Sequence, residues 1–190
     1  CSGSDWEHLL YRFDEENFFE IRPNAVHGKI VSNKGFVEWN MNLNLSKNSY
    51  YHYSHPWFYK GFFPKKKILT RDIFIEFNAE IITEELKIKN TFIGMNGHNW
   101  GKEHAYHYVY ANCNQWKNSQ NAYFDGFSAR IRIGAIPTPA LSACSLMINN
   151  QWYHFNEVSK SFLHHTKKMN SHSWSCAFKN SSHVLDVEIS

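Results

Sequence analysis

Apolar and polar residues alternate along several short stretches of the chain. The clearest stretch, residues 36–45, carries Val37, Trp39 and Met41 at alternate positions, with glutamate and asparagine between them. Successive side chains of a β-strand point to opposite faces, so this pattern predicts a strand with one buried face. Residues 72–81 repeat the alternation with isoleucine, phenylalanine and alanine on the apolar side.

Similar short stretches follow at intervals to the end of the chain, separated by the Asn, Gly and Ser residues that favour turns. Gly35 suits a hairpin turn before the strand at 36–45. No long amphipathic helix is apparent, and residues 6–13 are the best candidate for a short one. The pattern therefore predicts an all-β chain whose antiparallel strands close into a barrel or a sandwich.

Composition excludes some classes of partner. Of the 190 residues, 17% are aromatic and 19% are charged, and the formal net charge is +3. The Lys and Arg residues are dispersed, which argues against a nucleic-acid partner, and we interpret the run at 65–67 as a solvated loop. No apolar run approaches the roughly 18 residues of a membrane span, so we expect no stable span.

The two ends suggest an excerpt of a longer protein. The chain begins at Cys1 and stops within a strand-like pattern at 184–190. Composition changes most sharply near residue 94, so we expect two β-domains, 1–93 and 94–190, each incomplete at its outer end. The four cysteines lack metal-type spacing and are expected to be reduced thiols. We expect a cytoplasmic protein; lipid anchoring through Cys1 is the alternative.

A glycine-rich stretch at the centre of the chain carries candidate chemistry. Residues 94–101 contain His98, Asn99 and Trp100 among three glycines, and we interpret them as a flexible corner. In an extended chain His98 and Trp100 share a face while Asn99 points away. A strand with tyrosines at alternate positions follows, namely Tyr106, Tyr108 and Tyr110.

A second pair of candidates lies on a later strand. Tyr123 and Asp125 are two residues apart and share a face, with Phe127 next on that face. If this strand and the central stretch line one cavity, Asp125 is placed to hold His98, Tyr123 to donate a proton, and Trp100 to present its π face to a cation. The alternative is that each residue is an ordinary core or turn residue.

The histidines and arginines support no stronger motif. His pairs three residues apart occur at 52/55 and 104/107, but such a pair projects to opposite faces of a strand, so no metal site is expected. Arg130 and Arg132 alternate with apolar residues and are expected to face outward. Dinucleotide-binding, P-loop and serine-elbow motifs are absent from the sequence.

The "GHNWG" stretch and the aromatic strand after it resemble the tocopherol cyclase-like and hydroxyneurosporene synthase-like superfamily, also called the AttH/CrtC-like lipocalin fold. The likeness covers roughly residues 20–160; its central motif is fairly specific and the remainder is loose. It implies two lipocalin-like β-barrels or half-barrels around an apolar cavity. Complete members are usually longer than this chain.

The resemblance also implies chemistry on hydrophobic polyenes, by hydration, cyclisation or pericyclic ring closure. In the hydratase branch a His-x-Trp pair and a Tyr-x-Asp pair handle protons; these correspond to His98 with Trp100, and to Tyr123 with Asp125. We therefore expect a cofactor-free hydratase or cyclase that acts on an isoprenoid or other polyene by alkene protonation. Asn99, Phe127 and the three alternating tyrosines would contact the ligand.

Three other interpretations stay open. The same cavity would serve a non-catalytic carrier of a lipid or terpenoid. A purely structural β-domain would need no apolar pocket. The glycines at 94, 97 and 101 would also suit a corner in which positive φ angles, and Trp100 as a plug, are only architecture. Oligomeric state and the natural ligand are not apparent from the sequence.

Overall fold

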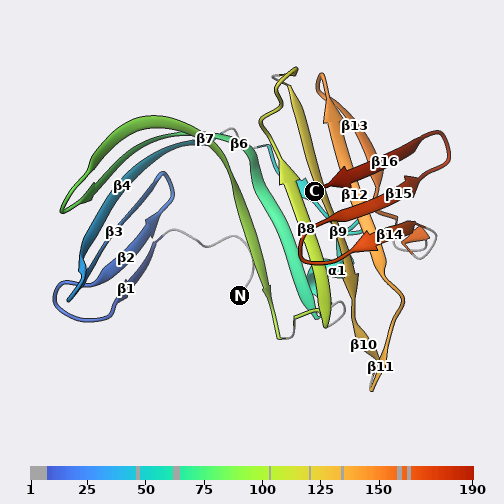
Figure 1. Ribbon diagram of the computed structural model, residues 1–190, viewed down its shortest axis with the longest axis horizontal. Helices are drawn as coiled ribbons and strands as arrows, with labels where there is room; N and C mark the ends of the chain where they lie inside the picture. The colour runs from blue at the N-terminus through green and yellow to red at the C-terminus, as the bar shows by residue number, and fades with distance from the viewer. Residues whose placement is uncertain are drawn as a thin grey trace. The chain divides into compact units, whose positions relative to one another are not determined.

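The computed structural model describes residues 8–45, 48–61, 65–102, 104–119, 121–133, 135–157, 160–161 and 164–190, without the side chains of Ile133 and His165. Its elements, in chain order, are β1 (Leu9–Arg12), β2 (Phe18–Arg22), β3 (Ala25–Ser32), β4 (Gly35–Leu45), β5 (Tyr50–Tyr51), α1 (Trp57–Lys60), β6 (Lys66–Thr83), β7 (Lys87–Gly101), β8 (His107–Cys113), β9 (Ala122–Arg130), β10 (Arg132–Ile133), β11 (Ile136–Pro137), β12 (Leu141–Ile148), β13 (Gln151–Phe155), β14 (His165–Met169), β15 (Trp174–Lys179) and β16 (Val184–Ile189) (Figure 1).

The chain divides into two compact units. Unit 1 comprises residues 1–48 and 74–96, and unit 2 comprises residues 49–73 and 97–190. The division differs from the expected domains because 49–73 belongs with the later part of the chain. The long strands β6 and β7 each contribute residues to both units. The expectation of an all-β chain with antiparallel half-barrels is confirmed.

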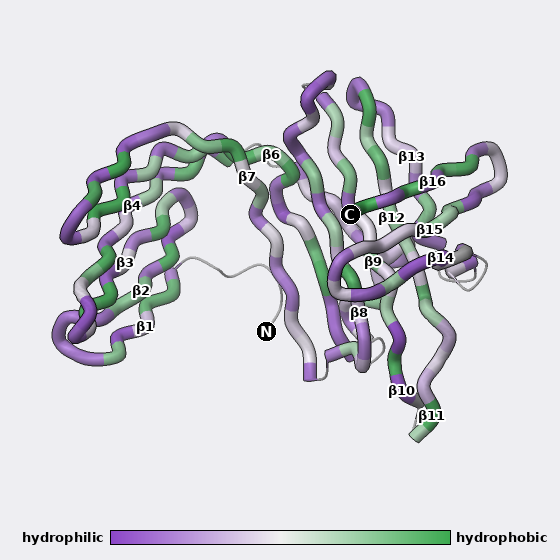
Figure 2. The backbone as a smooth tube through the Cα atoms, viewed as in Figure 1, coloured by the Kyte–Doolittle hydropathy of each residue, from purple (hydrophilic) through white to green (hydrophobic). Residues whose placement is uncertain are grey.

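Unit 1 is a curled antiparallel sheet. Strands β1, β2, β3, β4 and β6 are neighbours in that order, and β7 pairs with β6 (Figure 1). The alternation along β4 is confirmed, since Trp39 and Met41 are partly buried while Glu38 and Asn40 are exposed. Hydropathy accordingly alternates along this strand (Figure 2). The prediction of a short helix at 6–13 is wrong, because Leu9–Arg12 is strand β1 and pairs with β2.

One close approach fixes the packing of the apolar face of unit 1. Trp39 lies over Gly28, where an added Cβ would come within 2.4 Å of the indole. The ring of Phe19 lies 6.3 Å from that indole.

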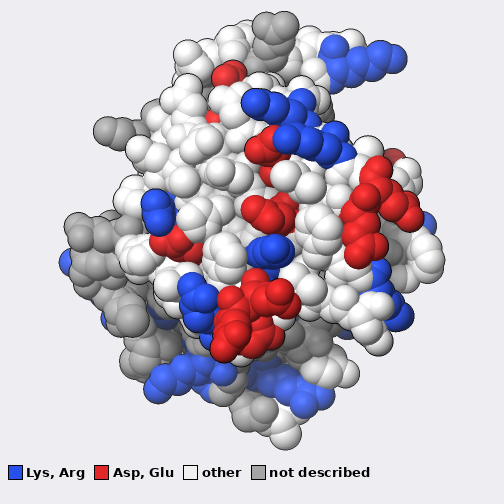
Figure 3. Space-filling model, turned by 90° about the vertical axis from the view of Figure 1, so that its left-hand side faces the viewer, with Lys and Arg blue, Asp and Glu red and all other residues white. Residues whose placement is uncertain are grey.

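At the β3–β4 turn Gly35 has a φ of 123°, which confirms the expected hairpin glycine. On the view of Figure 3 acidic and basic side chains are interspersed, as expected for a small net charge.

Unit 2 contains a four-stranded antiparallel sheet in the order β13-β12-β9-β8 and a three-stranded sheet in the order β14-β15-β16. The three-stranded sheet lies across one face of the four-stranded one (Figure 1). Their shared core is made of Phe124, Cys144, Phe155, Trp174, Cys176 and Phe178. Cys113, Cys144 and Cys176 are free thiols, as expected.

The opposite face of the four-stranded sheet carries the residues of interest. Because side chains alternate along β9, Phe124 enters the shared core while Tyr123 and Asp125 point to the other side. The β5 segment and the first part of β6 cover that side: Tyr50 of β5 pairs with Thr70 of β6 and bonds to Ser145 of β12. In the described part of the chain, no helix is long and apolar enough to cross a bilayer.

Candidate active site

The predicted pair on β9 is buried and hydrogen-bonded. Tyr123 and Asp125 are both 0% exposed. The Tyr123 hydroxyl donates to Asp125 Oδ2 at 2.8 Å. The strand periodicity that suggested a shared face is therefore confirmed for this pair.

Two more side chains contact Asp125, one from β8 and one from the residue that directly follows β5. His52 Nε2 lies 2.8 Å from Asp125 Oδ1, and the Tyr110 hydroxyl donates to Oδ2 at 2.8 Å. Burying a carboxylate without hydrogen-bond partners is costly, and the side chains of His52, Tyr110 and Tyr123 offset that cost for Asp125. His52 is 1% exposed, so both His52 and Asp125 are buried.

A polar row crosses the sheet at the level of Asp125. The strand register places Asn112, Asp125, Ser145 and His154 opposite one another across β8, β9, β12 and β13. Asn112 Nδ2 donates to the Tyr123 hydroxyl at 2.9 Å, and Ser145 Oγ lies 2.8 Å from His154 Nδ1. A polar row on a buried sheet face is unusual, because such faces normally carry apolar side chains.

Aromatic rings pack around this row. The Tyr50 ring stacks on Trp152 with centroids 5.2 Å apart, and it lies 4.6 Å from His52. Tyr123 meets Trp152 edge-on at 6.0 Å. The Tyr50 hydroxyl donates to Ser145 Oγ at 2.9 Å. The carboxylate therefore lies among rings whose π faces can interact with positive charge.

Burial and the aspartate together set the ionisation of the phenols. Desolvation, and then the charge of Asp125, raise the pKa of Tyr50, Tyr110 and Tyr123 well above the usual range. The pKa of Tyr59 is raised to about 12, chiefly by desolvation. These phenols keep their protons and act as fixed hydrogen-bond donors.

Two polar atoms beside the network lack an aligned partner among the described residues. They are His52 Nδ1 and Thr70 Oγ1, both buried. Thr70 lies against the phenols of Tyr110 and Tyr123, whose pKa values its hydroxyl lowers slightly against the larger effect of desolvation. A buried polar atom without a hydrogen-bond partner is uncommon, and among the described residues beside the network His52 Nδ1 is such an atom.

The second predicted pair lies on β7. His98 and Trp100 stack with ring centroids 4.8 Å apart and an interplanar angle of 16°, which confirms that they share a face. Trp100 contacts Tyr59 at 6.2 Å. Desolvation, and then Arg71, lower the pKa of His98. The imidazole bonded to Asp125 is His52, which corrects the expectation that Asp125 holds His98.

The stretch at 94–101 is not a corner. It is the final part of the continuous strand β7, and of its three glycines only Gly101 has a positive φ, at 143°. A Cβ on Gly101 would lie 2.1 Å from the carbonyl oxygen of Lys65. This glycine therefore permits a close approach of two backbones, and the corner predicted from the glycine spacing is wrong.

The predicted ligand-contacting residues fall in different surroundings. Tyr110 joins the Asp125 network, and Phe127 is partly buried on the same face of β9. Tyr106 and Tyr108 are 59% and 51% exposed, and Asn99 is also exposed. The row of alternating tyrosines thus runs from the surface to the aspartate.

Sequence reasoning missed His52, Tyr50, Ser145 and His154. A signal was available, since Tyr50 and His52 alternate, as do Trp152 and His154. The contacts of His52 with Asp125 and of Tyr50 with Ser145 join residues 73 and 95 positions apart in the chain. Local spacing contains no information on such pairings.

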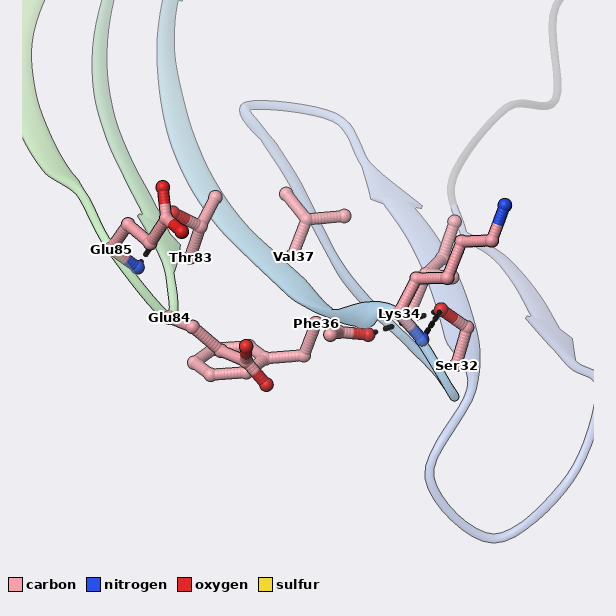
Figure 4. Close-up of a pocket in the computed structure, with 9 residues that line it drawn as sticks. Ser32, Lys34, Phe36, Val37, Thr83, Glu84 and Glu85 are labelled. Atoms are coloured by element: carbon pink, nitrogen blue, oxygen red, sulfur yellow. Dashed lines mark hydrogen bonds between the residues drawn. The ribbon is translucent and has the colours of Figure 1, made fainter.

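A separate hollow of about 420 Å³ lies in unit 1 at the ends of two hairpins. Its lining mixes polar residues such as Ser32 and Glu84 with the apolar Phe36 and Val37, and it is open to solvent (Figure 4). All of its residues belong to unit 1 and all of the Asp125 network belongs to unit 2, so the two are different sites.

Within the described residues, no group of three or more His, Cys, Asp or Glu side chains is arranged to hold a metal ion.

No protein-family model matches the chain, and neither a curated protein nor a solved structure is significantly similar to it.

Proposed function

We propose that the protein is a cofactor-free hydratase or cyclase that protonates an alkene of an isoprenoid or other hydrophobic polyene. The observation that supports this function best is the complete burial of Asp125 together with its hydrogen-bonded partner His52. Protonation of an alkene needs an acid that is shielded from water, because water would otherwise compete for the proton.

In this proposal Asp125 and His52 share the reactive proton. An imidazole and a carboxylate 2.8 Å apart can hold one proton between them as a net neutral pair. Tyr110 and Tyr123, which keep their own protons, fix the orientation of the carboxylate from its Oδ2 side. Oδ1 and His52 are then the side of the pair from which a proton leaves.

Aromatic rings would stabilise the cation formed from the alkene. The rings of Tyr50, Tyr123 and Trp152 lie around the polar row. Their π faces attract positive charge, and each such contact contributes about 0.5–2 kcal/mol. Trp100 offers a further face beside Tyr59.

In the proposed reaction, proton transfer to the alkene comes before the addition of oxygen. The alkene π bond takes the proton of the Asp125–His52 pair to form a C–H bond, which leaves a carbocation on the neighbouring carbon. Water, or a hydroxyl of the substrate, adds its oxygen to that carbon and loses a proton. His98, whose pKa is lowered by burial and by Arg71, is neutral and suited to accept that proton. Solvent takes the proton from His98 and returns one to the pair.

The test compares turnover with binding. Purified protein is incubated with lycopene and with geranylgeraniol, products are separated by mass spectrometry, and binding is followed by quenching of intrinsic fluorescence. Asp125→Asn keeps the shape of the side chain and removes the acid, so turnover should be abolished while binding is retained. His98→Ala should also lose turnover. Wild-type turnover in Asp125→Asn would contradict the proposal.

A non-catalytic carrier of a hydrophobic lipid or terpenoid is the second candidate. A carrier fits the 0% exposure of Asp125 without any movement of the protein, because a carried molecule does not need to reach the carboxylate. Enzyme action requires β5 or the first part of β6, which cover that side of the sheet, to move aside. Saturable binding of both polyenes without any product after prolonged incubation would select the carrier.

A further inference from the structure

One end of unit 2 gathers basic side chains from several segments. Lys65 and Lys66 lie at the start of β6, Lys102 follows β7, Arg130 ends β9 and Arg132 begins β10 (Figure 1). Backbone contacts hold these segments together: Lys102 N donates to Lys65 O at 3.2 Å, and Tyr106 N donates to Arg130 O at 2.9 Å. We call these five residues the basic end. The acidic residue within these spans, Glu103, lies outside the described residues.

Two exposed tyrosines belong to the same end. Arg132 lies over the Tyr106 ring at 4.1 Å, and Lys66 lies over the Tyr108 ring at 4.9 Å. Both tyrosines are more than half exposed. The cations therefore occupy one face of each ring while the phenol remains accessible at the surface.

An apolar hairpin extends from the same end. Arg132 of β10 pairs with Pro137 of β11, and the hairpin ends in hydrophobic residues (Figure 2). Ile136 is 73% exposed, the highest value among the large apolar side chains that the structure describes. A protruding isoleucine beside two arginines has no evident role in the packing of unit 2.

This combination has the chemistry of a membrane-contacting surface. Tyrosine favours the headgroup region, Lys and Arg bind lipid phosphates and carboxylates, and an exposed aliphatic side chain can enter the acyl boundary. In a single-stranded nucleic-acid site bases stack on open ring faces, and Lys66 and Arg132 already lie over one face of Tyr108 and of Tyr106. Ile136 also fits a lipid better than a nucleic acid.

We propose that the basic end, with Tyr106, Tyr108 and Ile136, docks reversibly on the surface of a membrane that contains anionic phospholipid. Lys and Arg supply attraction to the headgroups and Ile136 supplies shallow insertion. Docking does not depend on catalysis, and it stands if the proposed enzyme activity is disproved. It would place unit 2 where hydrophobic molecules dissolve.

The experiment is co-sedimentation of the full chain with two kinds of vesicle: phosphatidylcholine alone, and phosphatidylcholine with roughly a third of phosphatidylserine. We expect binding to the anionic vesicles that weakens as salt is raised, and little binding to the neutral ones. Because each basic residue near an anionic surface strengthens binding several-fold, Arg130→Gln/Arg132→Gln should reduce partitioning by roughly tenfold or more. Ile136→Ser should reduce it further at high salt, where insertion dominates.

Matched controls separate docking from general charge and folding. Lys34→Gln/Lys117→Gln makes the same change in charge at exposed positions elsewhere, and Val184→Ser removes a side chain that is 65% exposed. Both should bind like the wild type, and all variants should melt at the wild-type temperature. The proposal is overturned if anionic vesicles do not bind the wild type, if the controls lose as much binding, or if a single-stranded oligonucleotide binds in preference to the vesicles.

Discussion

His52 Nε2 lies 2.8 Å from Asp125 Oδ1, and neither side chain has more than 1% of its surface exposed. The two residues are 73 positions apart in the chain; Asp125 lies on β9, and His52 directly follows β5. Their contact places a proton that can be shared in the interior of a β-domain. The stability and the proposed chemistry of unit 2 both depend on this contact.

Removing His52 should be costly. In His52→Ala the aspartate loses its only described basic partner and remains buried, which typically costs about 3–5 kcal/mol. The control is Lys167→Ala, which removes an ion pair with Asp186 whose two side chains are mostly exposed. Pairs of that kind contribute about 0–1 kcal/mol. Urea unfolding at neutral pH measures both, and equal losses would show that the buried pair has no special role.

The phenols that donate to Asp125 should contribute more than an ordinary tyrosine. Tyr110→Phe and Tyr123→Phe each remove a hydrogen bond to a charged acceptor, worth about 1.5–3 kcal/mol. Tyr53→Phe removes the same atom from a hydrogen bond to the Lys66 carbonyl at 2.8 Å, a neutral acceptor, and should cost about 0.5–1.5 kcal/mol. The same unfolding assay ranks the three. If Tyr53→Phe is the most costly, the hydrogen bonds to Asp125 contribute no more than a bond to a neutral carbonyl.

Gly101 should be needed for the fold and Gly97 should not. Gly101→Ala combines a φ of 143° with a Cβ placed 2.1 Å from the Lys65 carbonyl oxygen, and we expect a loss of about 2–4 kcal/mol. Gly97 lies on the same strand without a positive φ, so Gly97→Ala should change stability little. Thermal melting of the two variants compares them. A harmless Gly101→Ala would mean that β6 and β7 separate easily at this end.

Unit 1 should lose stability in acid through Glu20. Arg22, His8 and His27 all bind this carboxylate. The hydrogen bond from Arg22 is the largest of the effects that hold its pKa below the usual 4.5. A carboxyl whose pKa is lowered on folding stabilises the protein above its unfolded pKa, and this contribution disappears as the pH falls through the folded pKa.

Glu20→Gln should therefore flatten the dependence of stability on pH below about 4.5, the usual pKa of a glutamate. Glu76→Gln, at an exposed position of the same unit, serves as the control and should leave the slope unchanged. Fluorescence-monitored unfolding at a series of pH values gives both slopes. An unchanged slope in Glu20→Gln would exclude this carboxylate as the acid-sensitive group.

Period-two patterning predicted most of the fold. It located β4 and β6 and the shared face of Tyr123 and Asp125, because alternation is a local property that the sheet preserves. It failed at 94–101, where three glycines suggested a corner and the structure has a strand. Glycine permits unusual backbone angles without requiring them, and here only Gly101 uses one.

The site was predictable only in part. Asp125 was identified, and a histidine was expected beside it, but the histidine was wrong. His98 is close to Trp100 along one strand, whereas His52 reaches Asp125 through the pairing of β5 with β6 and the packing of both on the four-stranded sheet. Such long-range pairings depend on the whole core, so a single sequence gives little guidance on them.

In the proposed reaction the Asp125–His52 pair protonates a carbon–carbon double bond. The most direct test is to incubate the protein with lycopene and with geranylgeraniol in deuterated water and to analyse any product by mass spectrometry after back-exchange into ordinary water. The wild type should give a product with one carbon-bound deuterium, and Asp125→Asn should give none. A product without carbon-bound deuterium, or bound polyene that is never converted, would contradict it.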